Sequence, residues 1–290
     1  MRIVSLVPSA SEIICDLGLK KSLVAVSHEC NYPASLNELP IITSSSIDNS
    51  LPQIQIDNLV RTKVAENKSL YEINDQLLND LAPDTIITQG VCNVCAVSDN
   101  QVEATLKGQL CTLSAETEII SLNGRSFNGI CKDIETLGKK LNKENEASLI
   151  INNANAEREI MLSEEKSDIR VLCLEWIDPY FSAGHWVPEQ IEMAGFVSAI
   201  GNPGDQSRVL TVDEIIESKP DVIAVICCGY SDKENEVFAH ELLNDKNLIN
   251  LNPIKQSKVF SFDSDSYFSR PTLRIVEGAK QLREKILSKI

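Results

Sequence analysis

This chain contains few histidines and aromatic residues, and it has fewer basic than acidic residues. It has three histidines, and its aromatic content is 5% over 290 residues. Its 27 Lys and Arg face 42 Asp and Glu, which gives a formal net charge of −15. Nucleic acids and anionic membrane surfaces bind basic patches, so this charge argues against both as partners. No apolar run reaches about eighteen residues, so we also expect no membrane insertion.

Several catalytic and targeting motifs are missing as well. There is no G-x-S-x-G, H-E-x-x-H or G-x-x-x-x-G-K-[ST] sequence, which argues against hydrolases and phosphate-loop enzymes. The first residues, MRIVSLVPSASEII, enter an apolar strand at once, without the basic and long apolar regions of a signal peptide. We therefore expect a cytoplasmic protein whose nine cysteines are reduced thiols rather than a disulfide framework.

Apolar segments of strand length alternate with helical patterns along the chain, which predicts an α/β fold with parallel sheets. A helix, a Pro-Asp turn and an apolar strand follow one another twice, with the turns at Pro83-Asp84 and Pro220-Asp221. This repeat predicts two similar lobes. The expected strands include residues 2–7, 23–26, 41–43, 85–88, 110–113, 170–174 and 258–262, and residues 201–208 are expected to form a loop.

A long polar segment, residues 142–166, contains no Gly or Pro and carries a narrow apolar stripe. Asn142 suits an N-cap, Glu144 and Glu146 suit the first turn, and Lys166 closes the far end. We predict one exposed helix that joins the two lobes. The predicted organisation is an N-terminal lobe, a helical linker and a C-terminal lobe, at residues 1–125, 126–166 and 167–290.

Ligands of open α/β sheets gather beyond the carboxyl ends of the strands, and several cysteines and histidines fall there. Cys92-x-x-Cys95 supplies half of a zinc site, and its matching second pair is missing. These cysteines would alternatively fill space between lobes or form a reversible disulfide. The side chains expected to complete a tetrahedral metal set are His28, Cys30, His185, Cys227 and Cys228.

Four of the few aromatic residues lie within eleven positions, at Trp176, Tyr180, Phe181 and Trp186. Such a cluster would line a large, flat organic ligand, or it would pack an interface. Ser9 stands at the start of an expected helix, where it would hold an anion or only cap the helix.

These segments together resemble the helical-backbone (class III) solute-binding proteins, and most closely the BtuF-like cobalamin-binding subgroup. The resemblance runs through RIVSLVPSASEIICDLGL, SHECNYP, LAPDTIITQGVCNVCAVS, DPYFSAGHWVPE, KPDVIAVICCG and SRPTLRIVEGAKQL, and so covers nearly the whole chain. It implies two Rossmann-like lobes joined by one long helix, with the ligand in a cleft between them. Family members are usually periplasmic or extracellular, and the loaded protein docks on an ABC permease.

Carried over by position, Tyr32, Phe181 and the loop from Tyr267 to Arg270 would face the ligand. The chain departs from the transport members at Gln89 and at Val209-Leu210, where those members have the aromatic rings that clamp the corrin.

We therefore predict a monomeric, non-enzymatic binding protein for a small molecule, either cobalamin (or a related corrinoid) or another metal-containing ligand. Direct binding of zinc or iron, or a cytosolic enzyme that uses a Cys/His site on the same fold, are the alternatives. The predicted ligand-binding residues are Ser9, His28, Tyr32, Trp176, Tyr180, Phe181, His185, Trp186, Tyr267 and Arg270, and the predicted metal ligands are Cys30, Cys92, Cys95, Cys227 and Cys228.

Overall fold

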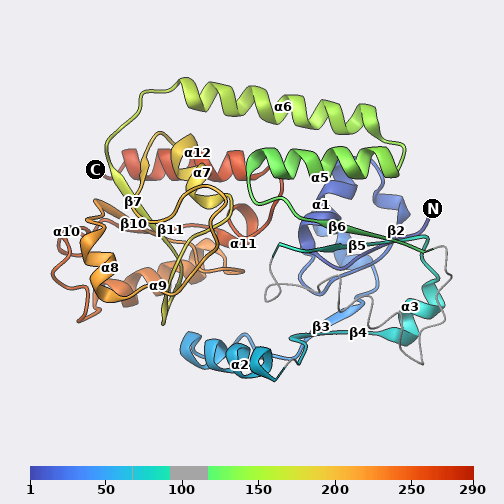
Figure 1. Ribbon diagram of the computed structural model, residues 1–290, viewed down its shortest axis with the longest axis horizontal. Helices are drawn as coiled ribbons and strands as arrows, with labels where there is room; N and C mark the ends of the chain where they lie inside the picture. The colour runs from blue at the N-terminus through green and yellow to red at the C-terminus, as the bar shows by residue number, and fades with distance from the viewer. Residues whose placement is uncertain (67, 92–116) are drawn as a thin grey trace. The chain divides into compact units, whose positions relative to one another are not determined.

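A computed structural model describes residues 1–66, 68–91 and 117–290 (Figure 1). The chain divides into two compact units. Unit 1 comprises Met1–Gly124 and Gly129–Ile150, and unit 2 comprises Arg125–Asn128 and Ile151–Ile290. Each unit contains its own mostly parallel sheet, which confirms the predicted α/β fold class. The predicted strand at residues 110–113 lies outside the described residues.

The sheet of unit 1 has four parallel strands in the order β2-β1-β5-β6. Strands Ile3 to Ser5 and Thr85 to Gln89 form its centre, and every residue of both is buried. Burial on both faces is typical of a parallel sheet, which explains the nearly continuous apolar sequence. The bounds are β1 Ile3–Ser5, β2 Leu23–Val26, β5 Thr85–Gln89 and β6 Glu118–Leu122.

Helices cover this sheet, and one of them packs on a well-defined core. Val4 and Ile86 pair across β1 and β5 and form a buried cluster with Leu78 of α3. Helix α1 contacts β1 and β2 from its position directly after β1. The remaining elements of this part of the chain are α1 Pro8–Asp16, η1 Lys20–Ser22, η2 Ala34–Glu38, β3 Thr43–Ser45, α2 Gln53–Ala65, β4 Tyr71–Ile73, α3 Asp75–Leu81 and α5 Phe127–Lys140.

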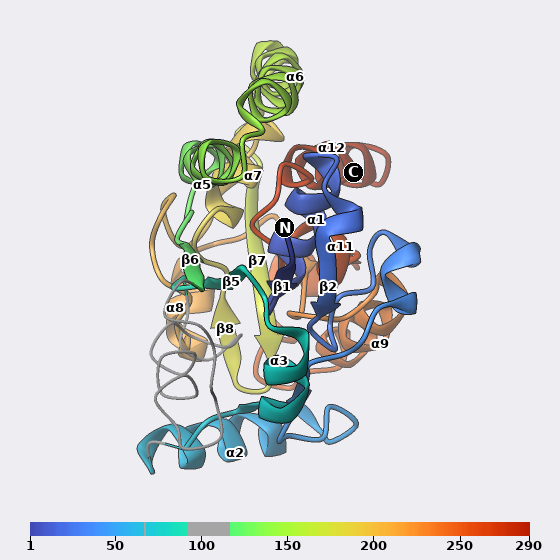
Figure 2. The ribbon, with the colours of Figure 1, turned by 90° about the vertical axis from the view of Figure 1, so that its right-hand side faces the viewer.

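The sheet of unit 2 follows the order β11-β10-β7-β8, with β9 also paired to β7. Its core cluster joins Leu172 and Val225 of the strands to Ile215 of α8 and Leu242 of α9. Helices α7 and α12 contact each other, and Figure 2 shows them close together as well. The bounds are β7 Arg170–Ile177, β8 Tyr180–Ser182, α7 Val187–Met193, β9 Val197–Ser198, α8 Val212–Glu217, β10 Val222–Val225, α9 Asp232–Leu243, α10 Asn252–Lys255, β11 Val259–Ser261, α11 Ser264–Tyr267 and α12 Ile275–Leu287.

The predicted internal repeat is visible in the hydrogen bonds of both units. In unit 1 the Asp84 carboxylate accepts the backbone N–H of Arg2 at 2.7 Å, just before β1. In unit 2 the Asp221 carboxylate accepts the backbone N–H of Arg170 at 2.9 Å, at the start of β7. Both aspartates follow the proline of a Pro-Asp turn, so the repeated sequence performs the same structural task twice.

The long helix is shorter than predicted. Helix α6 spans Glu144–Ser163, and Asn142 is not its N-cap because Asn142 adopts a left-handed φ of 55° two residues earlier. Asn tolerates that conformation better than most residues, which accounts for its place in the turn between α5 and α6. The boundary between the two units falls inside α6, after Ile150. No described helix is long and apolar enough to cross a bilayer.

The strand predicted at residues 170–174 is longer and forms one arm of a hairpin. Strand β7 continues to Ile177, and β8 returns antiparallel to it, pairing Phe181 with Trp176 and Tyr180 with Ile177. The expected strand at 41–43 is shifted: Ile41 forms only an isolated bridge with Val26, and β3 begins at Thr43.

Candidate functional site

The parallel strands of unit 1 bring several polar groups to one edge of its sheet. Helix α1 begins directly after β1, His28 lies two residues after β2, and Gln89 ends β5. Because β1 lies between β2 and β5, the segments that follow these strands are neighbours at the carboxyl edge. This edge is the candidate site of unit 1.

His28 is the most constrained polar side chain at this edge. Its Nδ1 lies 2.7 Å from Thr43 Oγ1, and the same oxygen accepts the His28 backbone N–H at 3.1 Å. Its Nε2 is buried and has no hydrogen-bond partner within the described part of the chain. Burial lowers the pKa of His28 because it disfavours the charged imidazolium. His28 is therefore a neutral imidazole at pH 7, fixed through Nδ1, and its Nε2 lies 3.9 Å from Glu29 Oε1, too far for a hydrogen bond.

Ser9 does not cap helix α1, so that interpretation is wrong. The N-cap is Val7, Pro8 occupies the first helical turn, and no side chain caps this end. Ser9 is buried, and its Oγ has no hydrogen-bond partner among the residues described.

The loop after β2 contains one buried and one exposed candidate residue, Cys30 and Tyr32. Cys30 is buried with its Sγ 3.1 Å from Ser11 Oγ, and this contact holds the loop against the first turns of α1. Tyr32 is 48% exposed.

The predicted aromatic cluster of unit 2 belongs largely to the packing of that unit. Trp176 and Tyr180 pack against the core cluster, and the Tyr180 hydroxyl donates to Asp245. Burial, aided by that carboxylate, raises the pKa of Tyr180 to about 12. Trp186 is buried, and its indole N–H donates to the carbonyl of Phe268 at 2.9 Å. The polar ends of Tyr180 and Trp186 are thus committed within unit 2.

Phe181 is half-buried and forms an isolated antiparallel bridge with Val209.

His185 is held in an uncommon backbone conformation. Its φ is 55°, its N–H donates to Asp205 O at 2.6 Å, and its carbonyl accepts from the Gly204 N–H at 2.8 Å. Glu175 supports the same region, since its carboxylate accepts from Gly184 N at 3.2 Å and from Ser207 Oγ at 2.5 Å. Such conformations persist where the surroundings enforce them, often at functional sites.

The side chain of His185 is also electrostatically constrained. Burial and the nearby Arg125 lower its pKa, so the imidazole is neutral at pH 7. Its Nδ1 is buried without a hydrogen-bond partner in the described ranges. His185 and His28 are thus both neutral histidines with one ring nitrogen that makes no hydrogen bond to the described residues.

The other predicted residues of unit 2 lie in different environments. Cys227 is 0% exposed and belongs to the core cluster, whereas Cys228 is exposed. Arg270 is 4% exposed and pairs with Asp265 at 2.6 Å. Tyr267 lies beneath the guanidinium of Arg274, 4.7 Å from its ring centre.

No three or more His, Cys, Asp and Glu side chains are grouped as a metal site requires among residues 1–66, 68–91 and 117–290. Cys92 and Cys95 lie outside these described residues, so the predicted metal set gains no support from Cys30, Cys227 or Cys228.

Sequence reasoning missed Thr43, which contacts His28, and Glu175, which accepts from Gly184 beside His185. Thr43 lies fifteen residues from His28, and no spacing rule connects them. Glu175 follows a predicted strand, so a polar residue at a strand end was the signal that could have identified it.

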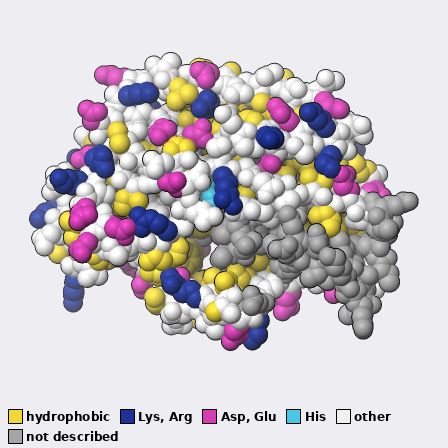
Figure 3. All heavy atoms as spheres, viewed as in Figure 1, with side chains coloured by type: hydrophobic (Ala, Val, Ile, Leu, Met, Phe, Trp, Pro, Cys, Tyr) yellow, Lys and Arg dark blue, Asp and Glu magenta, His cyan; other side chains and the backbone are white. Residues whose placement is uncertain are grey.

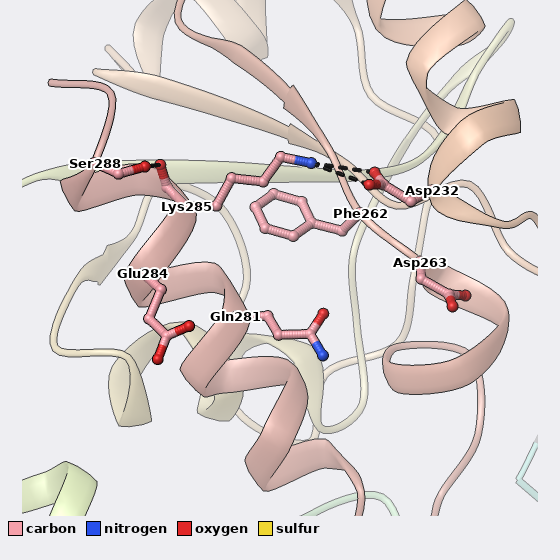
Figure 4. Close-up of a pocket in the computed structure, with 7 residues that line it drawn as sticks. All are labelled: Asp232, Phe262, Asp263, Gln281, Glu284, Lys285 and Ser288. Carbon is pink, nitrogen blue, oxygen red and sulfur yellow. Dashed lines mark hydrogen bonds and ion pairs between the residues drawn. The ribbon is translucent and has the colours of Figure 1, made fainter.

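A separate surface hollow of about 450 Å³ lies in unit 2, between the end of β11 and helix α12 (Figure 4). Lys285 crosses it, paired with Asp232 at 3.2 Å and 4.9 Å from the centre of the Phe262 ring. None of the predicted site residues that the structure describes lines the hollow, and its lysine is already paired with Asp232. Figure 3 shows basic and acidic side chains interspersed on the face that it displays, without a separate basic patch.

A family model described as periplasmic binding protein matches residues 3–266. The chain belongs to this family. The predicted resemblance to solute-binding proteins is therefore confirmed.

Solved structures of family members share the fold over nearly the full chain. The periplasmic vitamin B12 binding protein BtuF of Vibrio cholerae is 20% identical, with 99% of this chain and 97% of that chain covered and a TM-score of 0.67. The periplasmic heme binding protein HutB of Vibrio cholerae is 18% identical, with coverage of 99% and 98% and a TM-score of 0.72.

A possible iron-binding (periplasmic solute-binding) protein from Staphylococcus epidermidis is also 18% identical, with coverage of 98% of both chains and a TM-score of 0.72. At these identities the likeness establishes the fold. A comparison with curated proteins finds no match.

Proposed function

We propose that this protein binds a metal-bearing macrocycle, a corrinoid such as cobalamin or a porphyrin such as heme, and that His28 coordinates the metal. The observation that carries the proposal is the buried Nε2 of His28, which makes no hydrogen bond to the described residues and lies 3.9 Å from Glu29 Oε1, while the other ring nitrogen is fixed by Thr43. The ligands of the two similar Vibrio cholerae proteins, vitamin B12 and heme, support the same ligand class.

The contact with Thr43 makes His28 suited to metal coordination. When Nδ1 carries the proton and donates to Thr43 Oγ1, the lone pair of the neutral ring lies on Nε2. A hydrogen bond from the second ring nitrogen is the usual way in which proteins fix the tautomer and direction of a metal-binding histidine. A buried polar atom without a partner costs about 1–3 kcal/mol, which coordination would recover.

The residues that would contact the ligand are half-buried or exposed and lie near the carboxyl edges of the two sheets. They are His28 and Tyr32 in unit 1, and Phe181 and His185 in unit 2. The position of the ligand between the lobes, and delivery to an ABC permease, remain predictions of the family resemblance. The proposed role is reversible binding, without covalent chemistry on the ligand.

Spectroscopic titration with hemin and with aquacobalamin tests the proposal. Both metals have open or exchangeable axial positions, so coordination by imidazole shifts their visible absorption bands. We expect one of the two to bind with a shifted spectrum, and His28→Ala to weaken it at least tenfold. His240→Ala, an exposed histidine on α9, is the matched control and should bind like the wild type.

A bound macrocycle is distinguished from a bare ion by metal analysis of the purified protein. Cobalt or iron with matching visible bands supports the proposal, whereas zinc or iron without those bands supports direct metal binding. If neither macrocycle binds and no metal is present, the proposal is wrong.

A further inference from the structure

We infer that the N-terminus of helix α1, together with the Ser9 hydroxyl, forms a subsite for an oxyanion, a carboxylate or phosphate carried by the ligand. The identity of the ligand rests on the proposed function. The oxyanion chemistry rests on the geometry of α1 itself.

Helix α1 begins without any of the usual partners for its first N–H groups. It has nine residues, its N-cap is Val7, no side chain caps it, and its first turn contains no acidic residue. Pro8 has no N–H, so Ser9 and Ala10 carry the first free backbone donors of the helix. Both residues are buried, so water does not readily satisfy these donors.

Ser9 adds a hydroxyl to the same place. The side chains of a helix tilt toward its N-terminus, so a serine in the first turn directs its Oγ toward the free N–H groups. Ser9 is 2% exposed, and its Oγ has no hydrogen-bond partner among the described residues. Among the described residues, a buried hydroxyl thus lacks a partner at the helix end where the Ser9 and Ala10 N–H groups lie.

The neighbouring serines differ from Ser9 in this respect. Ser5 Oγ donates to the carbonyl of Val7 at 2.9 Å, and Ser11 Oγ donates to Ser5 Oγ at 2.8 Å. These two hydroxyls stabilise the β1–α1 connection, and Ser9 alone of the three retains a donor for something else in the described structure.

The surroundings are consistent with one oxyanion. The positive end of the helix dipole favours negative charge within about the first turn. Glu12, the first acidic residue of α1, lies in the second turn and is also buried. Gln89 ends the adjacent strand β5 and is 8% exposed, so the residue at this edge of β5 is also a polar one.

The inferred chemistry agrees with the ligand class proposed for the site. Heme carries propionate carboxylates, and cobalamin carries a phosphate in its nucleotide loop. A helix N-terminus binds either group through backbone N–H donors and the dipole. One subsite at the carboxyl edge of unit 1 would therefore orient the macrocycle whose metal His28 is proposed to coordinate.

The test introduces a carboxylate of the protein at the place where the oxyanion of the ligand is inferred to bind. Ser9→Asp places a carboxylate at the helix N-terminus, and Asn49→Asp adds the same charge at an exposed position of unit 1 as a control. Ser9→Ala removes the hydroxyl and retains the backbone donors, so it also serves if Ser9→Asp fails to fold. Affinity is measured for hemin against its dimethyl ester, and for cobalamin against cobinamide, which lacks the phosphate.

In whichever ligand pair binds, we expect the wild type and Asn49→Asp to bind the member that carries the oxyanion about tenfold more tightly than the member that lacks it. This preference should fall to about threefold in Ser9→Ala and should disappear in Ser9→Asp. Loss of preference for hemin over its ester identifies a carboxylate, and loss of preference for cobalamin over cobinamide identifies the phosphate. Equal affinity of the wild type for both members of each pair overturns the inference and leaves the proposed function intact.

Inorganic phosphate supplies an independent readout if neither macrocycle binds. A subsite with free donors predicts that millimolar phosphate raises the melting temperature of the wild type and of Asn49→Asp, but not of Ser9→Asp. In that case the proposed function fails and the oxyanion subsite stands. Equal effects of phosphate on all three proteins, together with no binding of a macrocycle, overturn both.

Discussion

His28 and Thr43 are joined twice, through a side-chain contact of 2.7 Å between Nδ1 and Oγ1 and a backbone-to-side-chain bond of 3.1 Å to the same oxygen. One hydroxyl therefore sets both the backbone position and the ring orientation of the proposed metal ligand. His28 and Thr43 come from neighbouring segments of unit 1, the loop after β2 and the start of β3.

Replacing Thr43 with Val should weaken both the fold and the proposed coordination. Valine has nearly the shape of threonine but lacks the hydroxyl that contacts both the backbone N–H and the Nδ1 of His28. Leaving such buried polar groups unsatisfied lowers the free energy of unfolding by about 1–3 kcal/mol. Urea denaturation measures the loss of stability, and the visible spectrum of the bound macrocycle measures coordination. Thr43→Ser keeps the hydroxyl and should retain the wild-type spectrum. A wild-type spectrum in Thr43→Val would show that Thr43 does not orient the ligand.

The half-buried histidines His28 and His185 predict a loss of stability in mild acid. Burial lowers the pKa values of His28 and His185 from their ordinary value of 6.5. Below that pH the unfolded chain binds more protons at these residues than the folded protein, so acid favours unfolding. Their contribution is complete above pH 6.5 and declines as the pH falls below it.

Melting temperatures of the wild type and of His28→Gln/His185→Gln between pH 7.5 and 5 test this dependence. The double variant should lose less stability than the wild type over that range, and His240→Gln should follow the wild type. Parallel curves for all three proteins would assign the acid sensitivity to other groups.

Gly184 should be intolerant of a side chain. A Cβ at this position would lie 2.3 Å from the backbone nitrogen of Ser207, so Gly184→Ala must displace the segment that holds His185. We expect a destabilisation of about 1–3 kcal/mol, the usual cost of overpacking, with weaker binding if His185 contacts the ligand.

Gly18→Ala is the control for backbone conformation. Gly18 has a φ of 75°, and no neighbouring atom lies within 4 Å of the position that an added Cβ would occupy. This variant therefore carries only the conformational cost of about 1 kcal/mol. Equal effects of the two variants in urea denaturation would show that the Ser207 contact relaxes without cost.

Glu189 of α7 should contribute more to stability than its sequence neighbour Glu192. The Glu189 carboxylate accepts the N–H of Phe127 at 2.7 Å and lies 3.4 Å from the Arg158 guanidinium. Glu189→Ala leaves both groups without this partner, and we expect a loss of about 2 kcal/mol. Exposed Glu192→Ala, on the same helix, should change stability by less than about 0.5 kcal/mol. A small effect of Glu189→Ala would show that solvent replaces the carboxylate at both groups.

The architecture was accessible from the sequence because several of its signals are local. The strand Leu23–Val26 agrees with the prediction residue for residue, and Gly18 follows α1 with the positive φ expected beyond a helix end. The repeated Pro-Asp turns predicted two related lobes, and Asp84 and Asp221 indeed make the same hydrogen bond in each unit.

The differences from the prediction arose where tertiary contacts decide. The strand predicted to end at residue 174 continues to Ile177 because β8 pairs with it, and Trp176 and Phe181 face each other across β7 and β8. The orientation of His28 depends on Thr43, and the conformation of His185 depends on Asp205. Such pairings are set by the fold and leave no periodic trace in the sequence.

The boundary between the units divides a continuous hydrogen-bonded helix, α6, after Ile150, and the segment Arg125–Asn128 belongs to unit 2 although the chain on both sides of it belongs to unit 1. The chain therefore passes between the units three times rather than once. Neither unit corresponds to one uninterrupted stretch of sequence, so no single cut in the gene releases either of them whole. Melting of one unit should therefore also fray the part of α6 that belongs to the other.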